Sequence, residues 1–396
     1  MELIRADAGW KKEILRFADE VFGTDLPPGG FARLIPDVYG PDAPCDGNHW
    51  LILEEGRIRA LLLTEPVSFV CGGDVLKGIG VGTVSVAEDA RGRGYMQLLL
   101  KTVKEWMKKE GYAFAVLSGQ RQRYAYWGYE PMEVCLTMQL EPGNGKHGLT
   151  RACADGQDAG ISFSEMREGG EEETSACRLF ESRPLHTKRK EQTFARHLKA
   201  GLCVPLTILR DGAFAGYLCE SVRNGEPRIT ELELADPELY PAVMKAYWEK
   251  RAPEGFSVEL AWYRTREFDF LEKICGRYLL RQGHQYDMAD LKEVLRFFLR
   301  AKKELFGLSD GEWSFRVREE EGETALFSCS VKGEEIRVRR FSEEEADPAE
   351  WEKAEEWDKG ELARFLFGTA SFVRHRPGIP AGWLPLPLYL PSADAV

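Results

Sequence analysis

Short runs of apolar residues, separated by turn-forming residues, dominate the first third of the chain. They lead into a stretch in which apolar residues recur at helical spacing, from Met96 to Met107, with charged residues opposite and Gly111 as a stop. The elements predicted from this pattern are strands at 49–53 and 57–63, a hairpin turning at 71–74 into a strand at 80–86, the helix, and a strand at 113–117. The predicted order is strands, loop, helix, strand.

The same order of elements recurs later in the chain. A hairpin is predicted over 204–220, a strand at 229–234, a helix at 238–250 and a strand at 257–262. The loop before the helix differs, since it reads Arg-Gly-Arg-Gly at 91–94 and Ala-Asp-Pro at 235–237. Two such runs can arise by chance, but we interpret them as a duplicated fold in which only the first copy kept its chemistry.

A third region begins near residue 286. Its pattern predicts an amphipathic helix at 291–302, strands at 313–318, 324–331 and 335–340, and a helix at 361–367 before a proline-rich tail. The stretch 342–360 is dominated by Glu, and we interpret it as a solvated linker or helix face. Residues 141–160, rich in Gly, Lys and Asp, are predicted to link the first two domains.

Composition narrows the class of protein. A chain of 396 residues is too long for one ordinary core and predicts two or three domains. No apolar run approaches the roughly 20 residues of a membrane-spanning helix, and the N-terminus lacks a secretion signal. Nine cysteines without a CxxC pair argue against a disulfide framework and a metal site. We therefore expect reduced thiols, a cytoplasmic location and no metal.

The formal charge of −12 makes the surface strongly acidic. Such a surface repels nucleic acid phosphates and favours encounters with cations, although solubility alone is the plainer interpretation. We expect neither nucleic acid nor a membrane as a partner.

The loop Arg91–Gly94 joins the end of a predicted strand to the start of a helix. Backbone N–H groups and the helix dipole converge there on one point, which favours an anion. Gly92 and Gly94 allow the backbone to approach a phosphate, and the two arginines can add charge-assisted bonds. The pattern indicates a site for a pyrophosphate-bearing cofactor, and the alternative is a basic turn that caps a helix.

Four aromatic residues lie within the segment 124–129, which reads Tyr-Ala-Tyr-Trp-Gly-Tyr. Trp127 and Tyr129 are typical of a packed corner. Tyr124 and Tyr126 cannot both be buried without partners for their hydroxyl groups, so one of them is a candidate proton donor.

Together these segments resemble the GNAT acetyltransferase superfamily. Its pyrophosphate loop, Gln/Arg-x-x-Gly-x-Gly/Ala, matches residues 91–96 except at Met96, and its later Tyr-x-x-x-Gly-Phe/Tyr element matches 124–129. The run Gly-Val-Gly-Thr-Val-Ser-Val-Ala at 80–87, the bulky Met96 and the length for three domains are similar to the Eis (enhanced intracellular survival) group.

The resemblance implies an α/β fold with mixed sheets, built from tandem GNAT-type folds of which the second is degenerate. The implied domains are a catalytic GNAT acetyltransferase domain at 1–145, a degenerate GNAT-like domain at 146–285, and a sterol-carrier-protein-like α/β domain at 286–396 that delivers the C-terminus. The second copy, without the glycines and with Pro237, is expected not to bind CoA.

The resemblance also implies acetyl-CoA as co-substrate and a set of residues that bind it. The central strand would pair with the pantetheine arm and polarise the thioester, the loop would hold the pyrophosphate, and two residues before the tyrosine would complete the site. The implied cofactor-binding residues are Val84, Ser85, Val86, Arg91, Gly92, Arg93, Gly94, Tyr95, Met96, Gln97, Gly119 and Gln120.

Two catalytic groups are implied by the resemblance. Tyr124 would be the general acid that protonates the departing thiolate. The general base of the group is the terminal carboxylate, which here belongs to Val396. The family usually ends in a bulky aromatic residue after an acidic residue two positions earlier. Asp394 keeps the spacing of the acidic residue, whereas Val396 is not aromatic and so departs from the family's usual last residue.

The reaction expected is acetyl transfer to a primary amine, such as an aminoglycoside-like, polyamine or lysine-type acceptor, by a homo-oligomer that is hexameric in Eis-like proteins. The alternative is an acyl-CoA-sensing or lipid-binding protein without catalysis. The Gly78–Gly82 run resembles part of a dinucleotide fingerprint, but it lies before a strand and not after one, so we set it aside.

Overall fold

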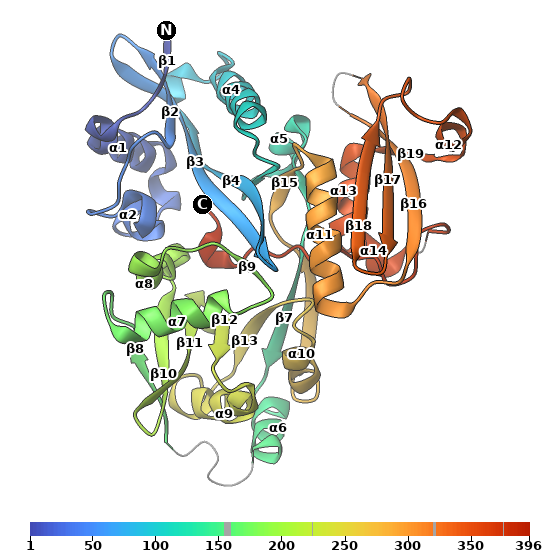
Figure 1. The fold of residues 1–396 in the computed structure, drawn as a ribbon. Helices are drawn as coiled ribbons and strands as arrows, with labels where there is room; N and C mark the ends of the chain where they lie inside the picture. Colours follow the sequence, from blue (N-terminus) through green and yellow to red (C-terminus); the bar gives the residue numbers. More distant parts are fainter. Residues whose placement is uncertain (154–159, 224, 320–321, 375) are drawn as a thin grey trace.

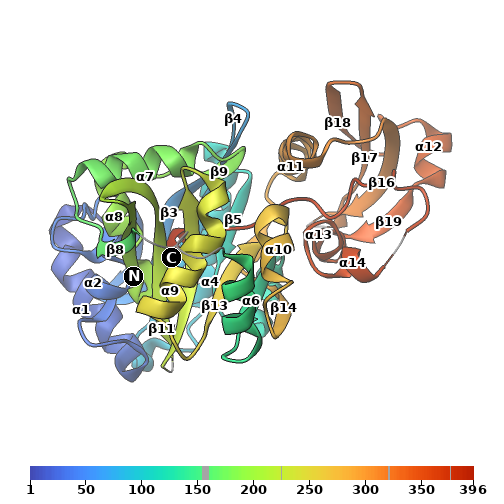
Figure 2. The same cartoon turned by 90° about the horizontal axis from the view of Figure 1, so that it is seen from below.

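The structure is a computed structural model that describes residues 1–153, 160–223, 225–319, 322–374 and 376–396. In these residues the strands form three mixed sheets, of eight, seven and four strands (Figure 1). Helices pack on the sheets, and the view in Figure 2 shows the third sheet set to one side of the other two. This confirms the predicted α/β class with mixed sheets. Within the described ranges, no helix is long and apolar enough to cross a membrane.

The first sheet carries the elements predicted for the first copy. Its strands are β1 (Glu2–Arg5), β2 (His49–Glu54), β3 (Arg57–Cys71), β4 (Asp74–Val86), β5 (Phe114–Leu117) and β6 (Glu130–Pro131). Its helices are α1 (Lys11–Phe22), α2 (Gly30–Leu34), α3 (Pro36–Tyr39), α4 (Tyr95–Glu110) and α5 (Arg121–Tyr124).

Both faces of this sheet are buried, because residues that alternate along a strand enter opposite cores. Ile52 and Leu62 pack in the cluster beneath α4, whereas Leu51 and Leu61 pack in the cluster beneath α1–α3. The helix α4 ends at Gly111, whose φ of 74° suits the left-handed C-cap predicted for it.

The second sheet repeats this arrangement around a second parallel strand pair, as predicted from the order of elements. Its strands are β7 (Val134–Leu140), β8 (Ile161–Glu165), β10 (Val204–Arg210), β11 (Ala213–Arg223), β12 (Glu226–Leu234), β13 (Phe256–Ala261) and β14 (Arg277–Gln282). Its helices are α6 (Asn144–Ala152), α7 (Glu171–Glu181), α8 (Phe194–His197), α9 (Tyr240–Lys250) and α10 (Thr265–Leu271). The helix α6 lies in the predicted linker 141–160, whose residues 154–159 are outside the described ranges, so part of that segment is helical.

Three strands join a sheet far from their place in the sequence. The strand β7 pairs with β13 and β14 of the second sheet, although it was predicted within the domain 1–145. The strand β15 (Gln285–Asp287) lies between β5 and β6 of the first sheet. The strand β9 (Leu185–Thr187) pairs with β3. Each of the first two sheets therefore includes strands from outside the part of the chain that was predicted to form it. The strands do not follow the predicted boundaries at 145 and 285.

The third sheet contains β16 (Gly311–Arg318), β17 (Thr324–Lys332), β18 (Glu335–Phe341) and β19 (Glu355–Asp358), with α11 (Leu291–Phe306), α12 (Pro348–Lys353), α13 (Lys359–Phe367) and α14 (Ala370–Val373). The prediction of a solvated linker at 342–360 is wrong in part, because β19 pairs with β16 and Trp357 is buried. The helix α11 connects this sheet to the first, since Phe298 packs against Phe69 of β3.

The tail that follows α14 returns to the first two sheets. Leu386, Leu388 and Leu390 are buried, and the last residues form a short 3₁₀ turn, η9 (Ser392–Asp394). The C-terminus ends between the first sheet and the helices of the second (Figure 1). The end of the chain is thus an interior element of the fold.

Candidate active site

The candidate site is built around a gap between two parallel strands of the first sheet. The strands β4 and β5 pair only over Gly78–Gly80 and Phe114–Val116. In the described chain, β4 continues to Val86 without a partner on that side. The predicted residues Val84, Ser85 and Val86 therefore lie on a strand segment whose edge toward β5 has no ladder hydrogen bonds.

A bulge shapes this segment of β4. The register with β3 shifts between Leu61 and Leu63, and Thr83 has a positive φ of 48°. The Tyr39 hydroxyl donates a 2.9 Å hydrogen bond to Thr83 Oγ1, and His49 Nε2 lies 3.1 Å from the Tyr39 oxygen. Burial lowers the pKa of His49 to about 4 and raises the pKa of Tyr39, so both side chains stay neutral. The sequence analysis did not detect these supporting residues.

The loop Arg91–Gly94 lies at the N-terminus of α4, as predicted from its position between strand and helix. Gly92 and Gly94 have φ values of 77° and 79°, which favour glycine. A Cβ on residue 92 would meet no atom within 4 Å, and one on residue 94 would meet only Gln97 Oε1 at 3.7 Å. The side-chain positions of these two glycines are therefore open, at a helix N-terminus of the kind that favours an anion.

The two arginines of the loop differ in their surroundings. Arg93 lies 3.3 Å from Glu54 at its Nη1 and donates from Nη2 to the carbonyl of Asp89 at 3.2 Å. The Tyr95 hydroxyl also donates to Glu54, and this bond is the main reason that the pKa of Glu54 is lowered. Arg91 is exposed. In this structure Arg93 and Tyr95 connect the loop to Glu54 of β2 through their side chains, and Arg93 is exposed as well. Gln97 is exposed beside the loop and Met96 is half-buried against the core under α4.

Tyr124 occupies a narrow space next to the splayed strands. It is 8% exposed, whereas Tyr126 is 80% exposed, which separates the two candidates for proton donation. A Cβ on residue 119 would come within 2.5 Å of the Tyr124 ring, so only glycine fits there. The Gly119 carbonyl accepts a 2.7 Å hydrogen bond from Gln285 on β15. Gln120 is exposed at the start of α5.

Burial raises the pKa of Tyr124, and Arg123 opposes this shift only in part. The hydroxyl group therefore carries its proton at neutral pH, which is the state that a general acid requires.

A cavity of about 430 Å³ lies between the first two sheets, and the end of the chain forms part of its lining. Ser118 after β5, Glu133 before β7 and Val396 line it together with residues of β12, β13 and the β14–β15 connection. Val396 packs against the cluster under α1–α3. It thus approaches β4 from the face opposite α4, and the cavity and the α4 loop lie on the two sides of the same strand.

The charged groups of this cavity are mostly paired. Glu133 accepts hydrogen bonds from His284 Nδ1 at 2.8 Å and from the Tyr286 hydroxyl at 2.5 Å. Burial alone would lower the pKa of His284, but the Glu133 carboxylate outweighs it and raises the pKa. Glu259 accepts from Arg228 at 2.8 Å and Arg281 at 2.7 Å.

The carboxylate of Val396 differs from the other acids of the cavity. No ion pair in the described part of the chain involves it. It is therefore an acidic group of the cavity that stays available to a ligand.

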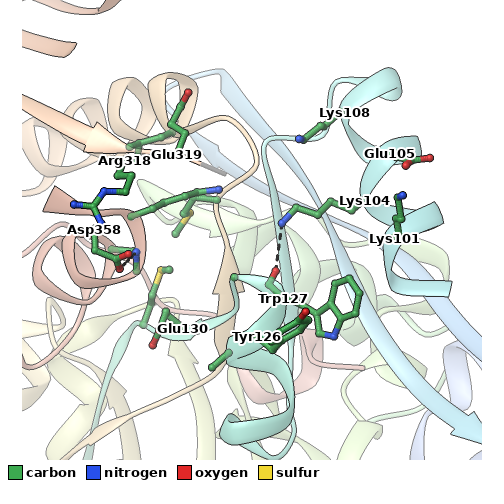
Figure 3. Close-up of a pocket in the computed structure, with 18 residues that line it drawn as sticks. Lys101, Lys104, Glu105, Lys108, Tyr126, Trp127, Glu130, Arg318, Glu319 and Asp358 are labelled. Atoms are coloured by element: carbon green, nitrogen blue, oxygen red, sulfur yellow. Dashed lines mark hydrogen bonds between the residues drawn. The ribbon is translucent and has the colours of Figure 1, made fainter. Parts of the chain in front are cut away.

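A second cleft, of about 580 Å³, lies between α4 and the third sheet (Figure 3). Lys101, Lys104 and Lys108 line one wall from a single face of α4, and Arg318 lines the other. Lys104 donates to the Trp127 carbonyl at 3.3 Å and forms a 3.0 Å ion pair with Asp287. Tyr126, the exposed one of the two candidate proton donors, lines this cleft, but Tyr124, Val396 and the residues predicted to bind the cofactor do not.

Comparisons with known proteins agree with this geometry. Residues 3–132 match the model of a family described as an acetyltransferase (GNAT) domain. No curated protein matches the chain.

Solved structures resemble the whole chain. Eis1 from Mycobacterium abscessus aligns with 12% identity over 98% of this chain and 96% of its own, with a TM-score of 0.62. A GCN5-related N-acetyltransferase from Anabaena variabilis aligns with 14% identity over 100% of both chains and a TM-score of 0.64. One from Kribbella flavida aligns with 15% identity over 92% and 89%, with a TM-score of 0.62. At these identities the likeness is one of fold, and it includes the second and third sheets.

Proposed function

We propose that this chain, an acyltransferase whose residues 3–132 form a GNAT acetyltransferase domain, transfers the acetyl group of acetyl-CoA to a primary amine. The observation that carries the proposal is the position of the Val396 carboxylate beside β4, in a cavity on the face opposite the α4 loop. A thioester bound in the strand gap and an amine bound in the cavity would meet at the same segment of β4.

The residues of the first sheet suit an acyl-CoA molecule. The unpaired edge of β4 at Val84–Val86 offers backbone groups to the amides of a pantetheine arm. The N-terminus of α4, with the open space at Gly92 and Gly94, suits a pyrophosphate. Gly119 and Gln120 would complete the site from the other strand of the gap. When bound, acetyl-CoA supplies the activated acetyl group.

The amine must lose a proton for the transfer to be completed. An alkyl ammonium has a pKa of about 10.4, whereas a terminal carboxylate has one of about 3.3–3.7. The Val396 carboxylate is therefore a weak base, and its contribution is mainly to orient the amine, since orientation can supply several kcal/mol. The acceptor reacts as the free amine, after its ammonium has given one proton to solvent, because an ammonium nitrogen has no lone pair. The amine nitrogen forms the bond to the carbonyl carbon, the carbon–sulfur bond breaks, the proton lost by the nitrogen passes to the Val396 carboxylate, and Tyr124 gives its proton to the thiolate. Exchange with solvent then removes the proton from the Val396 carboxyl group and returns one to the Tyr124 oxygen.

The acceptor is proposed to be a cationic amine of aminoglycoside-like, polyamine or lysine type. The Val396 carboxylate in the cavity supports a cation, whereas Glu133 is paired with His284 and Glu259 with Arg228 and Arg281. The resemblance to Eis-like proteins further suggests a cytoplasmic homo-oligomer, hexameric in that group, with a sterol-carrier-like third domain. Light scattering of the purified chain tests the oligomer, and a monomer would refute it.

The activity is tested by following CoA release from acetyl-CoA in the presence of a panel of amines. Turnover with at least one amine, lost in Tyr124→Phe, is expected. Binding of acetyl-CoA without turnover for any amine would instead support the alternative of an acyl-CoA-sensing protein.

A further inference from the structure

The second copy of the fold has a strand gap of its own, and the tail of the chain runs along it. The strands β12 and β13 pair only at Arg228–Ile229 and Ser257–Val258. The Ser392 hydroxyl donates to Glu259 on β13 at 3.3 Å. Tyr389 and Pro391 line a cavity together with both strands. In the first copy the equivalent gap is the proposed site of the pantetheine arm, so the two copies would use the same feature differently.

Asp394 is the point at which the tail is attached most firmly. It is 7% exposed and accepts four hydrogen bonds. Arg189 donates from Nε at 3.0 Å and from Nη2 at 2.7 Å. Thr187 Oγ1 donates at 2.9 Å and His197 Nε2 at 2.8 Å. Burial opposes ionisation, but Arg189 and His197 hold the pKa of Asp394 well below its usual range.

Each cation that holds Asp394 has a second carboxylate partner. Arg189 donates to both oxygens of Glu231 on β12 at 2.8 Å, and His197 Nδ1 donates to Asp37 on α3 at 2.9 Å. The residues Asp37, Thr187, Arg189, His197, Glu231 and Asp394 form what we call the tail clasp. It connects a helix of the first sheet, a strand of the second sheet and the tail.

The clasp limits where the C-terminus can lie. Only Ala395 separates Asp394 from Val396, and an extended residue spans at most about 3.3–3.6 Å. The Val396 carboxylate therefore stays within a few ångströms of the anchored residue, beside Gly80 and Gly82 of β4.

We propose that Arg189 and His197 are positioning residues. They fix Asp394 and so keep the Val396 carboxylate at the cavity of about 430 Å³ in which the amine is proposed to bind. The catalytic part of this inference rests on the function proposed above. The holding of the tail does not, because it concerns only contacts within the chain. The degenerate second copy then serves as the holder of a catalytic group, in place of the cofactor site that it lacks.

The test uses Asp394→Asn in the full-length protein. This change removes the shared carboxylate but leaves Arg189 paired with Glu231 and His197 paired with Asp37, so no buried charge loses its last partner. A second variant, His197→Gln, loosens the clasp from the other side and keeps a side chain that can donate a hydrogen bond. The matched control is Glu344→Gln, which removes an exposed carboxylate that is not part of the tail clasp.

Two readouts are compared. Amide hydrogen exchange of residues 389–396 should become faster by about tenfold or more in Asp394→Asn, as expected when hydrogen bonds to a charged group are lost, with exchange in α4 unchanged. The kcat should fall by about 10²-fold with the KM for acetyl-CoA unchanged, because misplacing one group affects the acceptor side only. The control should behave as the native protein.

Unchanged exchange of the tail in both clasp variants would overturn the proposal. Faster exchange with native kcat would also overturn it, because a loosened tail would then not affect catalysis. A native protein that acetylates no amine would refute the proposed function instead, and tail exchange would still decide whether the clasp holds the C-terminus.

Discussion

The carboxyl carbon of Val396 lies 2.9 Å from the point that a Cβ on residue 82 would occupy, so Gly82 leaves the space in which the chain ends. Gly80 does the same for the Val396 side chain, because its Cβ would lie 2.5 Å from Val396 Cγ2. The glycine run at 78–82 is thus explained by close packing, since Gly78 likewise makes room for the Phe114 ring. The alternation along β4 puts Gly80 and Gly82 on one face and Ile79 and Val81 on the other, beneath α4.

Gly82→Ala should displace the C-terminus from β4. We expect kcat to fall by about tenfold to 10²-fold with acetyl-CoA binding nearly unchanged, since an added methyl group shifts a positioned group by about an ångström. Steady-state kinetics and calorimetric binding check this. The matched control is Gly143→Ala, where a Cβ would meet no atom within 4 Å. Native turnover in Gly82→Ala would contradict a catalytic role for the chain end.

Extending the chain by two residues beyond Val396 should lower the turnover rate strongly. The extension moves the carboxylate without deleting a side chain, and a general acid–base group typically contributes about 10²–10⁴-fold. Binding of acetyl-CoA, measured separately, should stay as it is, because the α4 loop lies on the other face of the sheet. If the extended chain turns over at the native rate, the terminal carboxylate is not the base.

Tyr124→Phe should lose turnover by about 10²–10⁴-fold, because the variant keeps the ring and removes the hydroxyl group with its proton. Tyr126→Phe is the matched control, since that side chain is 80% exposed. Single-turnover measurements of thiol release compare the two variants. Equal rates in Tyr124→Phe and the native protein would exclude Tyr124 as the acid.

His197 should make the stability of the protein depend on pH. Burial would lower its pKa, but the bonds to Asp37 and Asp394 outweigh burial and raise the pKa from 6.5 to about 9. Since the folded state holds this proton more tightly than the unfolded state, the stabilisation is complete below pH 6.5 and is lost as the pH rises through about 9. The loss is of order 1–3 kcal/mol.

The measurement is the free energy of unfolding in urea between pH 6 and 10, for the native protein and for His197→Gln. Lys302 acts in the opposite direction, because burial lowers its pKa to about 8. Glu65, with a pKa raised to about 6 by burial, titrates at the lower edge of the window. Lys302 is present in each protein and cancels in the difference, whereas the charge of His197 lowers the pKa of Glu65, so the comparison is made above pH 7, where Glu65 is ionised in both proteins. A difference that does not change with pH would show that His197 keeps its ordinary pKa.

The sequence by itself determined the elements that depend on neighbouring residues. The periodicity from Met96 to Met107 and the stop at Gly111 predicted α4, which spans Tyr95–Glu110. The turn at 71–74 predicted the β3–β4 hairpin, and the Arg-Gly-Arg-Gly loop was placed at the helix N-terminus where it lies. These features are local because each depends on hydrogen bonds or side-chain spacing within a few residues.

The tertiary structure decided what depends on residues far apart in the chain. The pairing of β15 with β5 and the salt bridge of Arg93 with Glu54 join segments that carry no local signal for each other. The same is true of Asp394 and Arg189, which are 205 residues apart. Asp394 was recognised in the sequence only by its distance from the C-terminus. Only the folded chain brings Arg189 and His197 to Asp394. They are needed at that position because a buried carboxylate is stable only where the fold supplies cations to pair with it.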